Sequence, residues 1–169
     1  MLVRTKLLVA VALSVVAFPA LGQTAPAPAV ASPTILYASP ADLVSAVAKA
    51  KSLPSMVPQF LVAFGGYSAR VEFRRVPTPA SLHEKDDELL EVIEGSGTIV
   101  VGGTLKDSMR RDASNLGGSG VEGGQSYEVT KGSFFLFPAG VPHYFAKQGP
   151  EGLTVITVHV PHGAEFAKK

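Results

Sequence analysis

The pattern of hydrophobic positions changes sharply along this chain, and its first segment is almost wholly apolar. Residues 7–18 form a run interrupted only by a serine, Arg4 and Lys6 precede it, and Pro19, Ala20 and Gly22 lie just beyond it. A basic start, a short apolar run and small residues predict a cleavable secretory signal peptide over residues 1–22. The run is too short for the roughly 20 residues of a transmembrane helix.

The second segment contains one helix. Residues 23–38 are rich in Ala and Pro and predict an extended spacer without a core of its own. Ser39, Pro40 and Asp42 then give a cap residue, a proline at the first helical position and an acid in the first turn. Together with the apolar positions that follow, they predict a short amphipathic helix within residues 39–56.

From residue 57 the helical period disappears, and short β-rich runs alternate with Gly, Pro and Asn. This pattern is typical of an all-β sandwich or barrel rather than of alternating strands and helices. We expect one such domain over residues 57–162, followed by a tail at 163–169. In the strand that starts at Glu88, Leu90 and Val92 should share the face of Glu88, while Leu89 and Glu91 face the other way. The expected strands cover residues 60–64, 67–75, 89–94, 98–101, 127–129, 133–137, 143–146 and 153–160.

Residues 102–124 interrupt the β pattern. They contain seven glycines together with Asp, Asn and Ser, and almost nothing that would pack as a strand. We therefore predict an inserted glycine-rich loop, and loops of this length in compact domains are often lids or binding loops. Gly118, Gly120 and Gly123 have the spacing of a dinucleotide-binding loop, but the strand and helix that should flank such a loop are not predicted here.

Composition excludes several classes of function. The chain has 169 residues, enough for one domain with a sizeable core. Its 15 basic and 14 acidic residues would become 13 and 14 once Arg4 and Lys6 are removed, so no basic surface for nucleic acid is expected. With no cysteine, disulfides and a thiol nucleophile are excluded. The signal peptide predicts a periplasmic or secreted protein, with no membrane attachment after cleavage.

The candidate chemistry lies in a few side chains. The chain has four histidines, and His83 comes five residues before Glu88, close enough for a turn to bring the two side chains together. His143 follows a rigid turn, residues 138–142, that fixes where its ring points. Two imidazoles and a carboxylate would form a three-ligand site with open positions on a divalent ion. The alternative is that both histidines are ordinary, partly buried residues.

These residues lie in two segments that resemble the two motifs of the cupin superfamily. The first motif has the form G-x5-H-x-H-x3,4-E-x6-G, and the second G-x5-P-x-G-x2-H-x3-N. The resemblance covers roughly residues 60–160 and implies a small, single-domain, exported cupin with a double-stranded β-helix or jelly-roll barrel. The matching residues are His83, Glu88, Gly95, Gly132, Pro138, Gly140 and His143. The departures are Arg75, Ser81 and Lys147, in place of Gly, His and Asn.

Ser81 is the most consequential departure, because the resemblance implies three histidines and a glutamate as ligands. Three outcomes stay open: a three-ligand site, a replacement ligand from elsewhere, or a pocket that binds a small molecule without metal. His159 is the replacement candidate if the face it shares with Thr157 lines the barrel. Lys85 and Tyr144 are further candidates for the pocket.

The leading functional expectation is a cupin that binds Fe, Mn, Ni or Zn and acts on a small oxygen-bearing molecule. With a redox metal the chemistry would be of the dioxygenase type, and with zinc or manganese of the isomerase or lyase type. The alternative is a non-catalytic periplasmic cupin that binds or senses a small molecule or a metal. A homodimer is also compatible with the implied fold.

Overall fold

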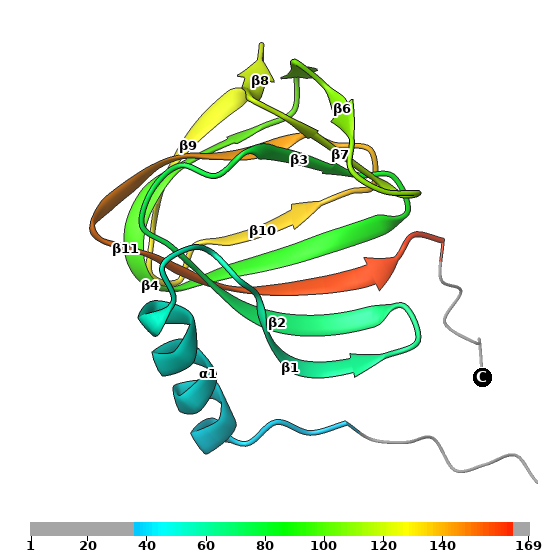
Figure 1. Ribbon diagram of the computed structural model, residues 1–169. Helices are drawn as coiled ribbons and strands as arrows, with labels where there is room; N and C mark the ends of the chain where they lie inside the picture. Colours follow the sequence, from blue (N-terminus) through cyan, green and yellow to red (C-terminus); the bar gives the residue numbers. More distant parts are fainter. Residues whose placement is uncertain (1–35, 164–169) are drawn as a thin grey trace, which may run out of the picture. The chain divides into compact units, whose positions relative to one another are not determined.

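The computed structural model describes residues 36–163, which form one helix and a set of antiparallel strands (Figure 1). The expected signal peptide, most of the spacer and nearly all of the tail lie outside these residues. The helix is α1 (Pro40–Ser52). The strands are β1 (Gln59–Phe64), β2 (Tyr67–Arg74), β3 (Ala80–His83), β4 (Asp86–Val101), β5 (Thr104–Lys106), β6 (Met109–Arg110), β7 (Asn115–Gly118), β8 (Gly120–Glu122), β9 (Gln125–Thr130), β10 (Phe134–Phe137) and β11 (His143–Pro161).

Helix α1 lies within the range that the sequence predicts. The Ser39 hydroxyl accepts a hydrogen bond from the Asp42 amide at 3.2 Å, and the Asp42 carboxylate accepts one from the Ser39 amide at 2.8 Å. The helix ends at Ser52, because Leu53 is extended, with φ −82° and ψ 146°, the conformation favoured before a proline such as Pro54. The apolar face of α1 packs on the outer face of β1 and β2.

Strands β4 and β11 are long, continuous and paired along most of their length. The sequence pattern predicted two short strands in place of each, and this prediction is wrong. The apparent breaks are bends in the ladder, where the register shifts between Gln148 and Leu153. At the bend Gly95 has φ +81°, and a Cβ there would lie 2.0 Å from the carbonyl oxygen of Gly152. Only glycine allows the two strands this approach.

The sheet curls around a single interior. Its order is β1-β2-β11-β3-β7-β6, while β4 pairs with β9, β10 and β11. Figure 1 shows β3 and β7 above the interior and β2 and β1 below it. This antiparallel all-β architecture, curled around one interior, confirms the predicted fold class. No helix in residues 36–163 has the length and apolar character needed to span a membrane.

The glycine-rich segment is not the strandless loop that its composition predicted. It contains β5, β6, β7 and β8, with β7 paired to β3 and β8 paired to β5. These strands are held by main-chain hydrogen bonds, which need no large side chains. Glycine also allows close packing, since a Cβ on Gly118 would lie 2.4 Å from the carbonyl oxygen of Lys106. The segment therefore extends the sheet beside β3.

One end of the interior is a purely apolar core. Leu90 and Val92 of β4 have no exposed surface, and neither do Leu153 and Val155 of β11. The remaining members of this cluster come from β4, β9, β10 and β11: Ile99, Val129, Phe137 and Phe145. This packing holds β4 and β11 rigid where they continue into the polar end.

Candidate metal centre

Glu88 stands at the polar end of the interior. It shares the inward face of β4 with Leu90 and Val92, as the alternation predicts, and its residue surface is only 3% exposed. A carboxylate in this position has left bulk water, so it needs protons or cations around it to offset the cost of burial.

Three histidines surround one oxygen of Glu88. The Nε2 atoms of His83, His143 and His159 lie 3.2, 3.3 and 3.9 Å from Glu88 Oε2. His83 ends β3, while His143 and His159 lie near opposite ends of β11. The structure therefore brings together the three residues of the predicted set and adds His159, whose inward face also carries the buried Thr157. Ligand atoms of His83, Glu88 and His159 all lie within 4.8 Å of one another.

A chain of hydrogen bonds from the glycine-rich segment sets the tautomer of His83. The Asn115 amide nitrogen donates to both oxygens of Asp112, at 2.9 and 2.8 Å, so the amide oxygen points away from Asp112. That oxygen lies 2.5 Å from His83 Nδ1 and can only accept a hydrogen bond. The Nδ1 atom therefore carries a hydrogen, and Nε2 faces Glu88. Sequence reasoning missed Asn115, because the register of β7 on β3 was not visible in its composition.

His143 is held by its own turn and by stacking. Its Nδ1 lies 3.4 Å from the carbonyl oxygen of Val141, so this nitrogen also carries the hydrogen. The ring stacks on Phe137 with a centroid distance of 4.6 Å and an interplanar angle of 7°. The turn before it is fixed by Asp87, whose Oδ1 accepts a hydrogen bond from the Ala139 amide at 2.8 Å. The Nε2 lone pair of His143 is thereby aimed at Glu88.

The imidazole nitrogens of the three histidines thus converge on the Glu88 carboxylate, and all of these groups can donate an electron pair to a cation. Glu88 Oε2 is fully buried and makes no hydrogen bond within the described residues, although three imidazole nitrogens approach it. An orphaned buried carboxylate oxygen among imidazole lone pairs is costly unless a cation or a proton lies between them. Three imidazoles and a carboxylate are suitable ligands for a divalent transition metal, so these residues fit such an ion.

Burial and close contacts shift the pKa values of Glu88, His83 and His159. Burial raises the pKa of Glu88, but the close approach of the His143 and His83 imidazoles outweighs it and holds the pKa well below its ordinary value. Burial lowers the pKa of His83, but the neighbouring Glu88 carboxylate and Asn115 side chain raise it above its ordinary value. Burial lowers the pKa of His159 to about 4, so its imidazole is neutral at physiological pH.

The other predicted pocket residues lie elsewhere. The backbone of Ser81 pairs with His143, but its hydroxyl lies 3.5 Å from Arg111 Nη1 and lines a neighbouring cavity. Lys85 is exposed to solvent. Phe145, rather than Tyr144, lines that cavity, because Phe145 and His143 share the inward face of β11.

A buried charged ladder on β2 was missed. Glu72 and Arg74 lie on the face of β2 opposite Val71 and Phe73, and they are only 5% and 6% exposed. Because α1 covers the outer face of β2, both faces of this strand are buried. Glu72 lies 2.5 Å from Arg74 and 3.8 Å from Arg70, so the ladder runs along the interior beside β11.

This architecture is similar to that of several solved structures. No family model and no curated protein matches the chain, but solved structures do. Hydroquinone 1,2-dioxygenase, solved with Cd²⁺ and 4-hydroxybenzonitrile, has a TM-score of 0.52 and 14% identity over 72% of this chain and 74% of that chain. A cupin protein from Bacteroides fragilis has a TM-score of 0.46 and 11% identity over 69% and 86% of the two chains. The chain shares the fold of the dioxygenase, in agreement with the cupin resemblance of its two sequence motifs.

A protein from Bacillus halodurans gives a similar result, with a TM-score of 0.48 and 19% identity over 72% of this chain and 81% of that chain. At such identities the likeness concerns the fold. The chemistry of this cupin-fold protein therefore has to be argued from its own residues.

Proposed function

We propose that this cupin-fold protein binds one divalent metal ion through His83, Glu88, His143 and His159, and acts on a small oxygen-bearing molecule. The observation that carries the proposal is the buried oxygen of Glu88, which makes no hydrogen bond within the described residues but has three imidazole nitrogens around it. Cation binding would satisfy all of these groups at once.

The environment of the cluster supports binding of a further molecule. The side chain of His83 is 20% exposed, whereas those of Glu88 and His143 are 4% and 3% exposed. Solvent therefore reaches the cluster at His83. When bound, a divalent metal would supply Lewis-acid polarisation or, if it is redox-active, dioxygen chemistry. The protein's own part is to hold the imidazoles of His83 and His143 in fixed tautomers and to keep the Glu88 carboxylate ionised.

A second candidate function is binding of a small molecule without catalysis. The position where the cupin pattern has a further histidine is occupied by Ser81, and Ser81 contacts the cationic side chain of Arg111. A guanidinium at this position favours an anionic ligand over an additional metal contact.

Cobalt spectroscopy tests the leading proposal and separates it from the alternative. We expect Co²⁺ added to the metal-free protein to give visible d–d bands that depend on His143, and catechol to shift them because its vicinal oxygens enter open positions. Bands that catechol leaves unchanged would favour the non-catalytic alternative. Absence of any protein-dependent band at saturating Co²⁺ would overturn the metal site.

We also propose that residues 1–22 direct export to the periplasm. The support is the basic start, the apolar run and the small residues that follow it. Fractionation of bacterial cells that express the full chain, followed by mass spectrometry of its N-terminus, should find a periplasmic protein that begins at Gln23. An intact Met1 on protein in the cytosolic fraction would contradict this proposal.

A further inference from the structure

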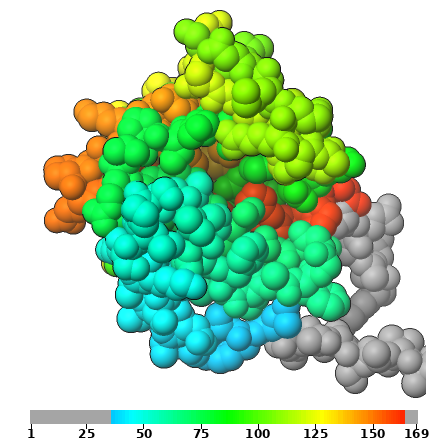
Figure 2. All heavy atoms as spheres, viewed as in Figure 1, coloured from blue at the N-terminus to red at the C-terminus, as the bar shows by residue number. Residues whose placement is uncertain are grey.

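A second polar region lies beside the histidine cluster, in a cavity of about 570 Å³. In Figure 2 this face is hollowed between the segment around β2 and the glycine-rich segment, with part of β11 at the floor. Ser81 and Phe145 line the cavity, and each is two residues from a histidine of the cluster. The four cluster residues themselves do not line it. The cavity therefore adjoins the candidate metal centre without sharing its ligands.

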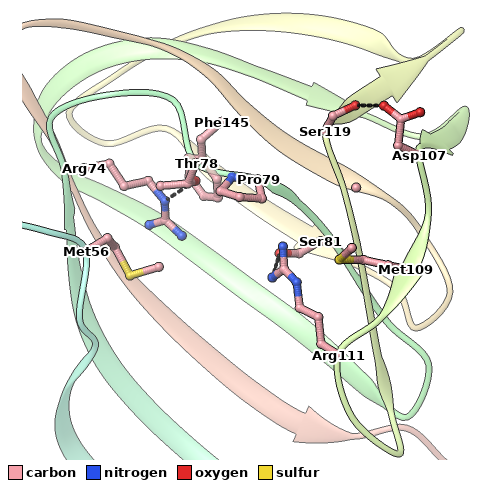
Figure 3. A pocket seen from close by; sticks show the side chains of 11 residues that line it. Met56, Arg74, Thr78, Pro79, Ser81, Asp107, Met109, Arg111, Ser119 and Phe145 are labelled. Carbon is pink, nitrogen blue, oxygen red and sulfur yellow. Dashed lines mark hydrogen bonds between the residues drawn. The ribbon is translucent and has the colours of Figure 1, made fainter.

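Arg74 lines this cavity (Figure 3) and carries a buried donor that no described residue satisfies. Its Nε donates to Thr78 Oγ1 at 3.3 Å, Nη2 lies 2.5 Å from a Glu72 oxygen, and the guanidinium stacks on Phe145 at 3.6 Å. These contacts fix the planar group in one orientation. The remaining nitrogen, Nη1, is buried and has no hydrogen-bond partner in the part of the chain that the structure describes. A buried charged donor without a partner is costly, and an acceptor on a ligand would satisfy it.

Arg111 provides a second guanidinium, from the glycine-rich segment. Its Nη2 donates to the carbonyl oxygen of Ala80 at 3.1 Å, and its Nη1 lies 3.5 Å from Ser81 Oγ. The side chain crosses Gly117, where an added Cβ would lie 2.1 Å from Arg111 Nε. Glycine at this position therefore leaves the space through which Arg111 reaches the cavity.

The charge and the lining of the cavity define what it can hold. Asp107 is the acidic residue that lines it, and its carboxylate already accepts a hydrogen bond from Ser119 at 2.5 Å. The single carboxylate of Glu72 pairs with both Arg70 and Arg74. These three side chains therefore keep a net positive charge. The apolar part of the lining consists of Met56, Pro79, Met109 and Phe145. Guanidinium groups beside an apolar wall suit an organic anion better than an inorganic one.

We propose that this cavity binds the carboxylate of a small organic acid through Arg74 and Arg111, with the acid's apolar body against the methionines and Phe145. As the substrate class for the neighbouring metal centre, this inference rests on the proposed function. The anion site itself does not, because none of its residues is a candidate ligand.

Binding of benzoate to the metal-free chain, measured by calorimetry, tests the proposal. Benzoate has a planar carboxylate and an apolar ring, and benzamide is a neutral control of the same shape. We expect Arg111→Gln to weaken benzoate binding about tenfold or more, the effect of losing a charge-assisted hydrogen bond. Arg110→Gln is the matched control, because Arg110 has the same charge but pairs with Glu84 outside the cavity. Arg74→Lys should also weaken binding, since lysine lacks the planar fork.

The outcomes separate this inference from the metal site. Benzoate binding retained in Glu88→Gln together with loss of metal would support the anion site independently of metal. Benzoate binding that is absent in the wild type, equally strong in Arg111→Gln and Arg110→Gln, or matched by benzamide would overturn the proposal. Failure of the metal tests with benzoate binding intact would refute the proposed function and leave the anion site standing.

Discussion

The two ends of the barrel interior are built from the same two strands and differ in chemistry. At one end β4 and β11 pair Glu88 with His159, and at the other they pair Val92 with Val155. Leu90, the residue of the apolar end nearest to Glu88 along β4, pairs with Thr157, and both are fully buried. Residues two positions apart on a strand face the same side, so a candidate metal ligand and a core residue can be neighbours on one face. The apolar end can therefore position the polar end directly.

This comparison explains how a costly cluster is held. Burying a carboxylate among imidazoles costs free energy, whereas burying Leu90, Val92, Leu153 and Val155 stabilises the fold. The same rigid ladder carries both groups, and a register slip of one residue would exchange their faces together. The apolar end should thus govern stability and the polar end metal binding.

The largest expected effect is at the polar end. Glu88→Gln keeps the shape of the side chain but removes the charge on which the three imidazoles converge, so we expect metal binding to be lost. Glu91→Gln is the matched control, since Glu91 lies on the outer face of the same strand and is exposed. Isothermal titration with Zn²⁺ measures both. Equal affinities in the two variants would contradict the assignment.

A substitution at the apolar end should have the opposite signature. Leu90→Ala removes a fully buried side chain, and we expect the free energy of unfolding to fall by about 2 to 5 kcal/mol. Leu89→Ala, on the other face, should cost less. Urea denaturation of the metal-free protein measures this, and the folded Leu90→Ala variant should still bind metal. A loss of metal without a loss of stability would break the comparison.

A smaller effect should come from the contact that sets the tautomer of His83. Asn115→Ala removes the acceptor for His83 Nδ1 and should lower metal affinity roughly 10- to 100-fold. Ser114→Ala is the neighbouring control, because Ser114 contacts Asp112 through its backbone amide, which the substitution keeps. Competition with a fluorescent zinc chelator measures the two affinities. If both variants matched the wild type, Asn115 would have no positioning role.

The smallest expected effect is a pH response at Asp112. Hydrogen bonds from Asn115 and Ser114 hold its pKa below the ordinary value of 3.8. Because the pKa of Asp112 is lower in the folded state, the ionised Asp112 stabilises the fold fully above its unfolded pKa. This stabilisation is lost as pH falls through the folded pKa. The midpoint of the pH-dependent shift of the Asn115 side-chain amide signals in NMR spectra should therefore lie below pH 3.8. A midpoint at or above pH 3.8 would contradict this assignment.

The sequence predicts those parts of the fold and the site that depend on side-chain patterns, and it misses those that depend on main-chain pairing. Strand alternation predicts that Glu88, Leu90 and Val92 share one face, and that Thr157 and His159 share another. The structure shows that both of these faces point inward. The strands of the glycine-rich segment did not follow, because main-chain pairing leaves no side-chain pattern. Asn115 and Arg111, which lie in that segment, were therefore missed.

The burial of the charged residues of β2 could not be predicted from the sequence either. Glu72 and Arg74 alternate with Val71 and Phe73, a pattern usually typical of one solvated face. Helix α1 covers the apolar face, so the charged face turns inward, where the two residues pair with each other. A strand pattern alone cannot show which face a distant helix will cover.

The central claim is that Glu88 and its three histidines hold a divalent metal, and elemental analysis of protein purified without chelators tests it most directly. The account predicts stoichiometric iron, manganese, nickel or zinc in the wild type, lost in His143→Ala. Protein that stays metal-free under every loading condition, or a His143→Ala variant that keeps its full metal content, would contradict it.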